Sequence, residues 1–368
     1  MRPLHVLLAI GTRPEAVKLA PVVHELRRRP DVTVRVLATA QHRQMLDQIL
    51  AFFDVVADID LDLMRRNQGL AELTSRMVAA VDAVLVDEQP DLVLAQGDTT
   101  TVMVTALCAF YRQIRFGHVE AGLRTGNKYS PFPEEMNRSL VARLADLHFA
   151  PTERSRANLL HEGIAPDRVS VTGNTVIDAL QWAVERVDPA EFAPPEGRRL
   201  VLVTAHRREH FGTPFEQICD GVRTIADRGD TEVLYPVHPN PSISEVARAR
   251  LADHPRIRLT EPLDYPRFVA AMRAAHLILT DSGGVQEEAP SLGKPILVLR
   301  DDTERPEGVD AGTARLVGPH AERIATQANR LLDDPDAYRE MARAQNPYGD
   351  GHAARRIVDT CLDTGASP

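Results

Sequence analysis

Short apolar runs alternate with longer amphipathic segments along the first half of this chain. The apolar runs predict β-strands at 4–10, 32–38, 91–95, 115–119, 147–150 and 169–171. The segments between them carry apolar residues at helical spacing and predict helices at 42–53, 70–87, 100–111, 134–145 and 152–162. Such an alternation is typical of a parallel sheet that has helices on both faces.

The alternation stops once, near the middle of the chain, and then resumes. Segment 188–197 is rich in proline and charge and has no periodicity, which indicates a linker or an exposed loop between domains. A chain of 368 residues also exceeds the usual size of a single hydrophobic core. Beyond this segment we expect a closing helix at 353–362 and strands at 200–204, 232–236, 257–260, 277–280 and 295–299. The predicted fold class is α/β, with two facing doubly wound, Rossmann-like domains.

Composition and charge restrict the partners that the chain can bind. The net charge of −9 and an aromatic content of 5% do not suit a nucleic-acid partner, which needs a basic surface and stacking side chains. No run approaches the roughly 20 apolar residues of a membrane span. The first apolar run is too short for a signal sequence, and the cysteines Cys108, Cys219 and Cys361 lack disulfide or metal spacing. We therefore expect a cytoplasmic protein without a membrane partner.

Three acidic residues lie in turns that glycine or proline frames, and two of them directly follow apolar strands. They are Asp98, Glu120 and Glu134. Because ligands bind at the carboxyl ends of parallel strands, acids just beyond those ends point toward a ligand site. Each acid by itself could equally be a turn residue or a helix N-cap. The three together favour proton chemistry.

Two glycine-containing turns offer sites for an anion. Gly11 to Lys18 follows the first strand and opens the first helix, so that its free amides and Arg13 could bind a phosphate. In the second half, the amides of Ser282 to Gly284 could hold a diphosphate while Glu288 accepts from ribose hydroxyls. The alternative is a plain glycine-rich turn. Neither segment has the spacing of a dinucleotide fingerprint or a P-loop, so no NAD is expected.

The segment from His206 to His210 has the spacing of an inverted zinc-protease motif. That motif needs a helix, whereas this segment directly follows a predicted strand and precedes Pro214. We therefore expect no metal, and we expect His206 to meet a phosphate. His238 is similarly placed after a strand, although a single loop histidine is as often structural.

Taken together, segments spread over nearly the whole chain resemble the non-hydrolysing UDP-N-acetylglucosamine 2-epimerase family. They are GTRPEAVK, TAQHRQMLDQ, QGDTTT, GHVEAGLRTG, YSPFPEE, TGNTVIDAL, TAHRRE, YPVHPNP, LTDSGGVQEEAPSLGKP, TERPE and NPYGDG. The resemblance implies a GT-B arrangement with the active site in the interdomain cleft, a homodimer, and no NAD or metal. It also implies that the last helix returns to the first domain. The N-terminal catalytic domain would then comprise 1–173 and 353–368, and the UDP-binding domain 174–352.

The resemblance further implies the reversible conversion of UDP-N-acetylglucosamine to UDP-N-acetylmannosamine. UDP is eliminated across C1 and C2 to give 2-acetamidoglucal, and it then adds back with the opposite configuration at C2. By motif position, the implied roles are proton handling for Asp98, Glu120 and Glu134, assistance to the leaving diphosphate for His206, a cation beside the carboxylates for Lys18, UDP binding for Arg13, Ser282, Gly283, Gly284, Glu288 and Arg305, and contact with uracil for Phe268. Which carboxylate removes the proton and which returns it is left open.

Some members of this family bind a second UDP-sugar as an activator. The corresponding residues here are Gln41, Gln44, Gln68, Arg207 and His238. An arginine that some members carry just before the third glutamine is Asn67 in this chain. We therefore expect substrate activation to be weak or absent.

Three other functions remain open at this point. A GT-B glycosyltransferase would bind UDP equally well but would have no reason to carry three carboxylates in its first domain. A sugar-nucleotide hydrolase would release free sugar if water intercepted the glucal. A catalytically idle UDP-sugar sensor would not need the three acids together with Lys18 and His206. The downstream pathway and any further modification of the substrate are also open.

Overall fold

The protein is described by a computed structural model that covers residues 2–39, 43–65 and 68–365. Contacts within the chain divide it into two compact units. Unit 1 comprises Met1–Ala179 and Gly349–Pro368, and unit 2 comprises Leu180–Tyr348. The domain boundaries that the sequence predicted, at 173 and 353, stay predictions.

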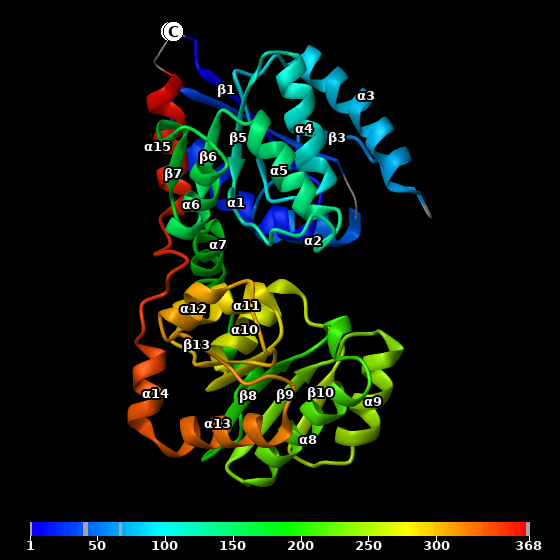
Figure 1. Cartoon of the computed structure of the whole chain (residues 1–368), viewed down its shortest axis with the longest axis vertical. Coiled ribbons are helices and arrows are strands. Elements are labelled where there is room, and N and C mark those ends of the chain that lie inside the picture. Colours follow the sequence, from blue (N-terminus) through cyan, green and yellow to red (C-terminus); the bar gives the residue numbers. More distant parts are fainter. Residues whose placement is uncertain (1, 40–42, 66–67, 366–368) are drawn as a thin grey trace. The chain divides into compact units, whose positions relative to one another are not determined.

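Unit 1 is built on a parallel sheet with the strand order β3-β2-β1-β4-β5-β6-β7 (Figure 1). The order reverses between β1 and β4, which is the point at which doubly wound folds bind ligands. The elements are β1 (Leu4–Ile10), α1 (Arg13–Arg27), β2 (Val32–Ala38), α2 (Arg43–Phe52), β3 (Ile59–Asp60), α3 (Leu70–Glu88), β4 (Leu92–Gln96), α4 (Thr100–Tyr111), β5 (Arg115–Val119), α5 (Glu134–Leu144), β6 (Leu147–Ala150), α6 (Glu153–His161), β7 (Val169–Val171), α7 (Thr175–Val184) and α15 (Ala353–Gly365). The boundary between the two units falls within α7.

Helices cover the sheet of unit 1 in two groups. Helix α1 packs with α2 and α15, whereas α4 lies between α3 and α5. The second group buries a core of Leu, Val and Met side chains together with Cys108 and Phe116. Strands β4 and β5 are buried along most of their length, as expected for strands covered on both faces.

The closing helix α15 belongs to unit 1, and specific contacts attach it there. The half-buried carboxylate of Asp178 accepts hydrogen bonds from the amides of Ala353 at 3.2 Å and Ala354 at 2.9 Å, at the start of α15. Burial raises the pKa of Asp178 to about 6, although these two bonds oppose the shift. Arg29, just beyond α1, pairs with Asp359 of α15 at 2.7 Å. The first and last parts of the chain therefore fold together.

Unit 2 repeats the same topology without any evident repeat in sequence. Its strand order is β10-β9-β8-β11-β12-β13, and the reversal falls between β8 and β11. The elements are β8 (Arg199–Thr204), α8 (Thr213–Asp227), β9 (Thr231–Pro236), α9 (Pro241–Leu251), β10 (Ile257–Thr260), α10 (Tyr265–Ala274), β11 (Leu277–Thr280), α11 (Gly283–Glu288), β12 (Ile296–Val298), α12 (Pro306–Asp310), β13 (Ala314–Leu316), α13 (Ala321–Asp333) and α14 (Pro335–Ala342). Helices α8, α9, α13 and α14 share one core with the sheet.

The structure differs from the sequence prediction at a few segments. The short strands β3 and β13 were not predicted, since two or three residues are too few to show a period. The proline-rich segment 188–197 lies within unit 2, where a 3-10 helix at Pro189–Phe192 packs against α10 and buries Phe192. It is therefore part of unit 2 and does not connect the two units.

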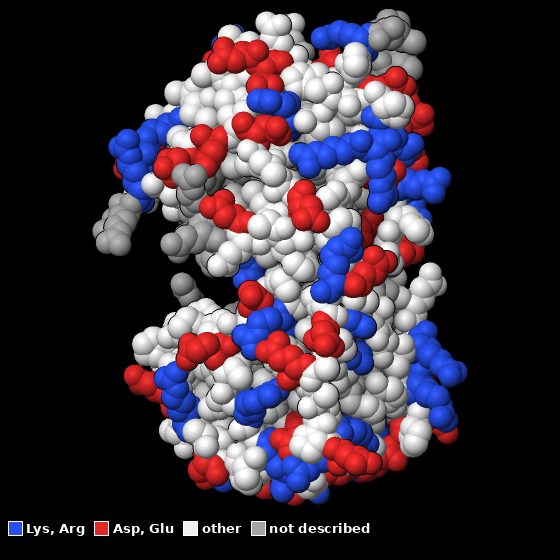
Figure 2. Space-filling view, turned by 180° about the vertical axis from the view of Figure 1, so that it is seen from behind, with Lys and Arg blue, Asp and Glu red and all other residues white. Residues whose placement is uncertain are grey.

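Among the described residues, no helix combines the length and the apolar character that crossing a bilayer requires. On the face drawn in Figure 2, basic and acidic side chains are interspersed and form no extended surface of one sign.

Candidate active site

Glu120 lies at the carboxyl end of β5, where a lysine and two side-chain amides bind its carboxylate. The Lys18 ammonium donates to both of its oxygens, at 2.6 and 2.7 Å. The side-chain amide of Asn174 donates to Oε1 at 2.8 Å, and that of Gln96 donates to Oε2. The carboxylate is 8% exposed, so its charge is balanced by a cation and two amides and not by water. The structure thus places Lys18 beside a carboxylate.

The backbone of Glu120 is held in an unfavourable conformation. Its φ angle is 62°, in the left-handed region that costs a residue with a side chain about 1–2 kcal/mol. The next turn requires glycine, because a Cβ on Gly122 would lie 2.2 Å from the Ser155 carbonyl oxygen. Backbone strain of this kind concentrates at functional sites, where neighbouring contacts maintain it. The strained turn thus aims Glu120 at Lys18, Gln96 and Asn174.

Asp98 follows β4 and pairs with α5. Its Oδ2 accepts from Arg138 Nε at 2.8 Å and lies 2.6 Å from the second guanidinium nitrogen. The Asn137 amide donates to the Asp98 carbonyl at 2.8 Å. Glu134 is the first residue of α5, four positions before Arg138, and therefore shares a helix face with the arginine that holds Asp98. Helix α5 thus associates two of the three predicted acids.

Glu15 is a further acid in this region that the sequence reasoning did not select. Its Oε2 accepts from the amides of Gly11 at 2.5 Å and Thr12 at 2.9 Å, and its Oε1 accepts from the Thr99 hydroxyl at 2.5 Å. Burial raises its pKa to about 7 despite these bonds. Glu15 therefore ties the turn after β1, where Arg13 begins α1, to the turn after β4 that carries Asp98.

In unit 2, His206 follows β8 and stacks on His238, which follows β9. The two rings are 5.5 Å apart and nearly parallel, at 9°. Burial lowers the pKa of His206, and the nearby Asp281 carboxylate opposes that shift. The two histidines that the sequence placed after separate strands are thus neighbours in the structure.

The glycine-rich turn of unit 2 brings most of the predicted UDP-binding residues together. Ser282 is the N-cap of α11, which begins at Gly283. A Cβ on Gly283 would lie 3.9 Å from the Arg305 guanidinium carbon, and one on Gly284 would lie 3.7 Å from Glu288 Oε1. The free amides of the helix, a cation and a carboxylate thus surround one turn.

Two side chains extend this cluster. The Tyr265 hydroxyl donates to Glu288 at 3.4 Å, and Phe268 lies one turn further along α10 and is half-buried. Arg305 pairs with the buried carboxylate of Glu287.

The predicted activator residues are only partly associated in the structure. Arg207 lies beside His206 and pairs with Glu304 at 3.1 Å, and its Nε donates to the Asp281 carbonyl at 3.2 Å. Gln68 instead accepts from Arg76 of α3, in unit 1. Gln41, Asn67 and the side chain of Gln44 lie outside the described residues.

Within the described ranges, no group of three or more His, Cys, Asp and Glu side chains is arranged to hold a metal ion. Glu209 and His210 lie in a 3-10 helix and not in the long helix that an inverted zinc-protease motif requires.

The two doubly wound units and their strand-end clusters define a two-domain α/β enzyme of the GT-B-like class. The model of the UDP-N-acetylglucosamine 2-epimerase family matches residues 24–362. A UDP-N-acetylglucosamine 2-epimerase of Bacillus subtilis is 52% identical and covers 98% of this chain and 96% of its own, and one of Escherichia coli K12 is 50% identical with coverages of 97% and 98%. The crystal structure of UDP-GlcNAc 2-epimerase from Neisseria meningitidis bound to UDP-GlcNAc superposes with a TM-score of 0.89 at 46% identity, over 98% of this chain and 100% of that one. The chain therefore belongs to the UDP-N-acetylglucosamine 2-epimerase family of isomerases, and both the predicted family and the predicted fold class are confirmed.

Proposed function

We propose that this isomerase interconverts UDP-N-acetylglucosamine and UDP-N-acetylmannosamine by eliminating UDP and adding it back. The observation that carries the proposal is the strained, cation-paired Glu120 in a cluster with Lys18, Gln96 and Asn174. A carboxylate in this state can exchange a proton with carbon only if its position is maintained while its charge changes, and the three donors supply that support.

Proton handling is assigned to the acids of unit 1. One carboxylate removes the C2 proton, the C2–H electron pair forms the C1=C2 double bond, and the C1–O pair leaves with UDP. A second carboxylic acid then protonates C2 from the opposite face while the UDP oxygen rejoins C1. Glu120, Asp98 and Glu134 are the candidates, and Lys18 and Arg138 form ion pairs with the first two.

The UDP moiety is assigned to unit 2. The amides of Ser282 to Gly284 and the Arg305 guanidinium would bind the diphosphate, and Glu288 would accept from the ribose. His206 would face the diphosphate, and Phe268 the uracil. Relatives solved with UDP-GlcNAc or UDP support a UDP-sugar as the ligand.

The mechanism is tested by isotope exchange. Product formed in D₂O should carry one deuterium at C2, because the acid that returns the proton exchanges with solvent. Oxygen-18 placed in the anomeric bridge should scramble into the diphosphate, because UDP leaves and returns. A C2 hydrogen that is retained, or a requirement for added NAD, would contradict elimination. Accumulation of free sugar would instead indicate a hydrolase, and an unchanged substrate would favour a transferase or a sensor.

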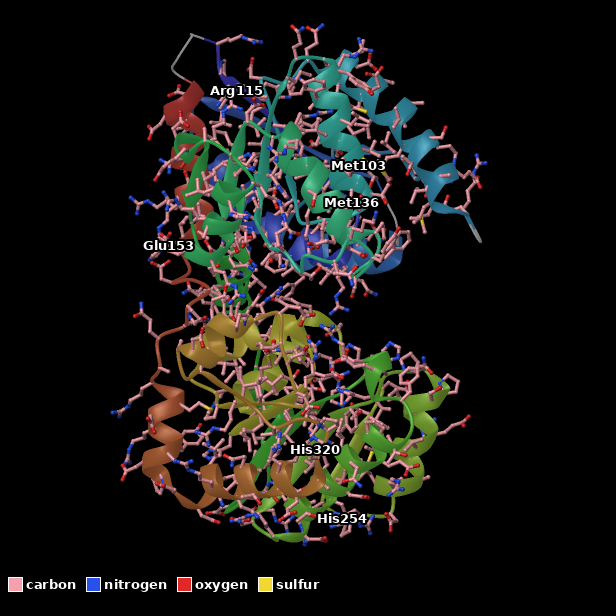
Figure 3. The ribbon with its side chains drawn as sticks, in the orientation of Figure 1. Met103, Arg115, Met136, Glu153, His254 and His320 are labelled. Carbon is pink, nitrogen blue, oxygen red and sulfur yellow. The ribbon has the colours of Figure 1, made fainter. Side chains whose placement is uncertain are left out.

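A homodimer is supported by exposed apolar side chains on neighbouring helices of unit 1. Phe110 and Tyr111 of α4 and Leu140 of α5 are exposed, as is Met136. The two helices pack together, and Figure 3 labels Met103 and Met136 on them. Analytical ultracentrifugation should show a dimer that Phe110→Glu with Leu140→Arg dissociates, whereas Val56→Glu, at another exposed apolar position, should not. A wild-type monomer would contradict the assignment.

The activator site is proposed to be weak. Arg207 is paired with Glu304, and Asn67 stands where some members carry arginine. Starting from UDP-N-acetylmannosamine alone, the reverse reaction should begin without a lag. A long lag that traces of UDP-N-acetylglucosamine abolish would show a working activator site.

A further inference from the structure

Asp281 is a completely buried aspartate that directly follows β11. No motif or residue spacing in the sequence indicated a function for it. One of its oxygens, Oδ2, accepts from the backbone amides of His206 and Arg207, both at 2.8 Å. A buried carboxylate without partners would cost several kcal/mol, so these bonds are needed to keep it ionised. They also attach the turn after β8 to the turn after β11, on either side of the reversal in strand order.

The same carboxylate faces two imidazole rings. His206 Nδ1 is 3.5 Å from Oδ1, and His210 Nδ1 is 3.3 Å from Oδ2. Burial alone would raise the pKa of Asp281, but His210, His206 and the two amides outweigh it, so that the pKa lies below its usual value. Asp281 is therefore a fixed negative charge beside the Nδ1 edge of the His206 ring.

The position of the His206 ring is determined on two sides. Its Nδ1 edge faces Asp281, and one of its faces stacks on His238. Since the two ring nitrogens point in different directions, Nε2 points away from Asp281, and the side chain is 44% exposed. A ring oriented in this way presents a single nitrogen to a ligand.

The other charged groups around this pair come from the segments next to it. Arg207 and His210 follow β8 and His238 follows β9, and all three lower the pKa of His206. Glu304, after β12, pairs with Arg207. Among the groups acting on His206, Asp281 is the one that favours its protonated form.

We propose that Asp281 is a positioning residue that orients His206 and balances its positive charge, so that Nε2–H of His206 meets the diphosphate as UDP leaves. This inference rests on the proposed function. When the C1–O bond breaks, its electron pair moves onto the diphosphate, and a protonated His206 stabilises that charge through a hydrogen bond. Asp281 does not touch the substrate and undergoes no reaction. It acts on the reaction through His206, as the buried acid of a catalytic triad acts through its histidine.

The tautomer of His206 tests the proposal in the unmodified protein. With ¹⁵N-labelled histidine and His206→Gln for assignment, we expect neutral His206 to carry its proton on Nδ1, facing Asp281. A proton on Nε2 in the neutral ring would overturn the proposal. This readout does not depend on turnover, so it can fail while the epimerase assay succeeds, and it can succeed while that assay fails.

A substitution separates positioning from folding. Asp281→Asn can still accept the two amide bonds but carries no charge. We expect kcat to fall roughly 10²-fold, with KM little changed, and the alkaline limb of the kcat profile to move to lower pH, because His206 loses its proton more easily without a counter-ion. The matched control is Asp227→Asn, which removes the charge from another Asp–His pair of unit 2, that with His254 at 3.1 Å, and should leave kcat and its profile unchanged.

Two results would contradict the proposal here. One is an unchanged kcat in Asp281→Asn. The other is a fall in kcat together with an unchanged pH profile and an unchanged His206 titration, which would indicate a purely structural role. If Asp281→Asn does not fold, the tautomer of the wild-type ring decides the question.

Discussion

The two units of this chain share a strand order, but the residues at the point where that order reverses differ in their chemistry. After the fourth strand of its sheet in order of sequence, unit 1 carries Asp98 and unit 2 carries Asp281. The Asp98 side chain is 25% exposed and pairs with an arginine, whereas Asp281 is 0% exposed and binds backbone amides. Asp98 therefore remains partly open to solvent, whereas Asp281 is enclosed and can only orient its neighbours.

The two units also differ in the other groups at their strand ends. Unit 1 collects side-chain acids with their cations, as Glu120 with Lys18 shows. Unit 2 instead presents backbone amides at Ser282 to Gly284 and the imidazole of His206. In the proposed function, one topology thus supports a proton-handling site in unit 1 and an anion-binding site in unit 2, and the residues after the strands decide which.

The largest effect should come from removing the acids of unit 1. Glu120→Gln, Asp98→Asn and Glu134→Gln should each lower kcat by about 10²- to 10⁴-fold, the range for losing a general acid or base. The melting temperature should stay nearly constant, because Lys18 at Glu120 and Arg138 at Asp98 remain partly exposed to solvent. Steady-state kinetics and calorimetric melting provide the two readouts. A loss of folding in all three variants would make these acids structural.

The next effect concerns the anion-binding site of unit 2. Glu288→Ala should weaken UDP binding by about 1–3 kcal/mol, because a charged hydrogen bond to the ribose is lost. Glu120→Gln should leave UDP affinity unchanged, since it lies in the other unit. Titration calorimetry with UDP measures both. Equal affinities in wild type and Glu288→Ala would place the ribose elsewhere.

An effect on stability should appear in acid, where buried histidines of unit 1 become charged. His118 and His148 are paired across β5 and β6, and burial lowers the pKa of each to about 4. A neutral imidazole is thus favoured in the folded state, so stability present above the unfolded pKa of 6.5 is lost as the pH falls from 6.5 toward 4. The loss should reach about 2–3 kcal/mol per histidine.

His148→Gln tests this pH dependence. Between pH 7 and pH 5, the melting temperature of the variant should fall less than that of the wild-type protein. The control is His320→Gln, at an exposed histidine of unit 2 that Figure 3 labels. Identical pH dependence in wild type and His148→Gln would contradict the explanation.

The smallest effect should come from Glu15. Because burial raises its pKa to about 7, the folded state favours the protonated acid, and the stability that it contributes below pH 4.5 is lost as the pH rises through 7. Glu15→Gln can accept from Gly11 and Thr12 and donate to Thr99 without a buried charge. We expect about 1 kcal/mol of added stability at pH 8 and no gain at pH 5. Differential scanning calorimetry at the two pH values checks the sign, and a loss at pH 8 would show that the carboxylate itself is required.

The sequence was most informative where period and turn chemistry agreed. Strands β1, β2, β5, β6 and β11 were predicted with the bounds that the structure has, since each is an apolar run that ends at a glycine, a threonine or a polar turn. The glycine-framed turns also indicated Glu120 and Ser282. Weak elements such as β3 escaped prediction because neighbouring strands, and not their own residues, stabilise them.

What the sequence alone determined was the set of local elements, the order of its reactive residues and, through its motifs, the family. What only the tertiary structure decided was which of those residues meet. Asn174 lies 54 positions beyond Glu120 and Asp281 lies 75 beyond His206, yet each pair is in contact. Periodicity describes a segment by itself, whereas these contacts depend on which strands pair and where their ends coincide. Burial also belongs to the assembled sheet, and complete burial is what restricts Asp281 to positioning a histidine.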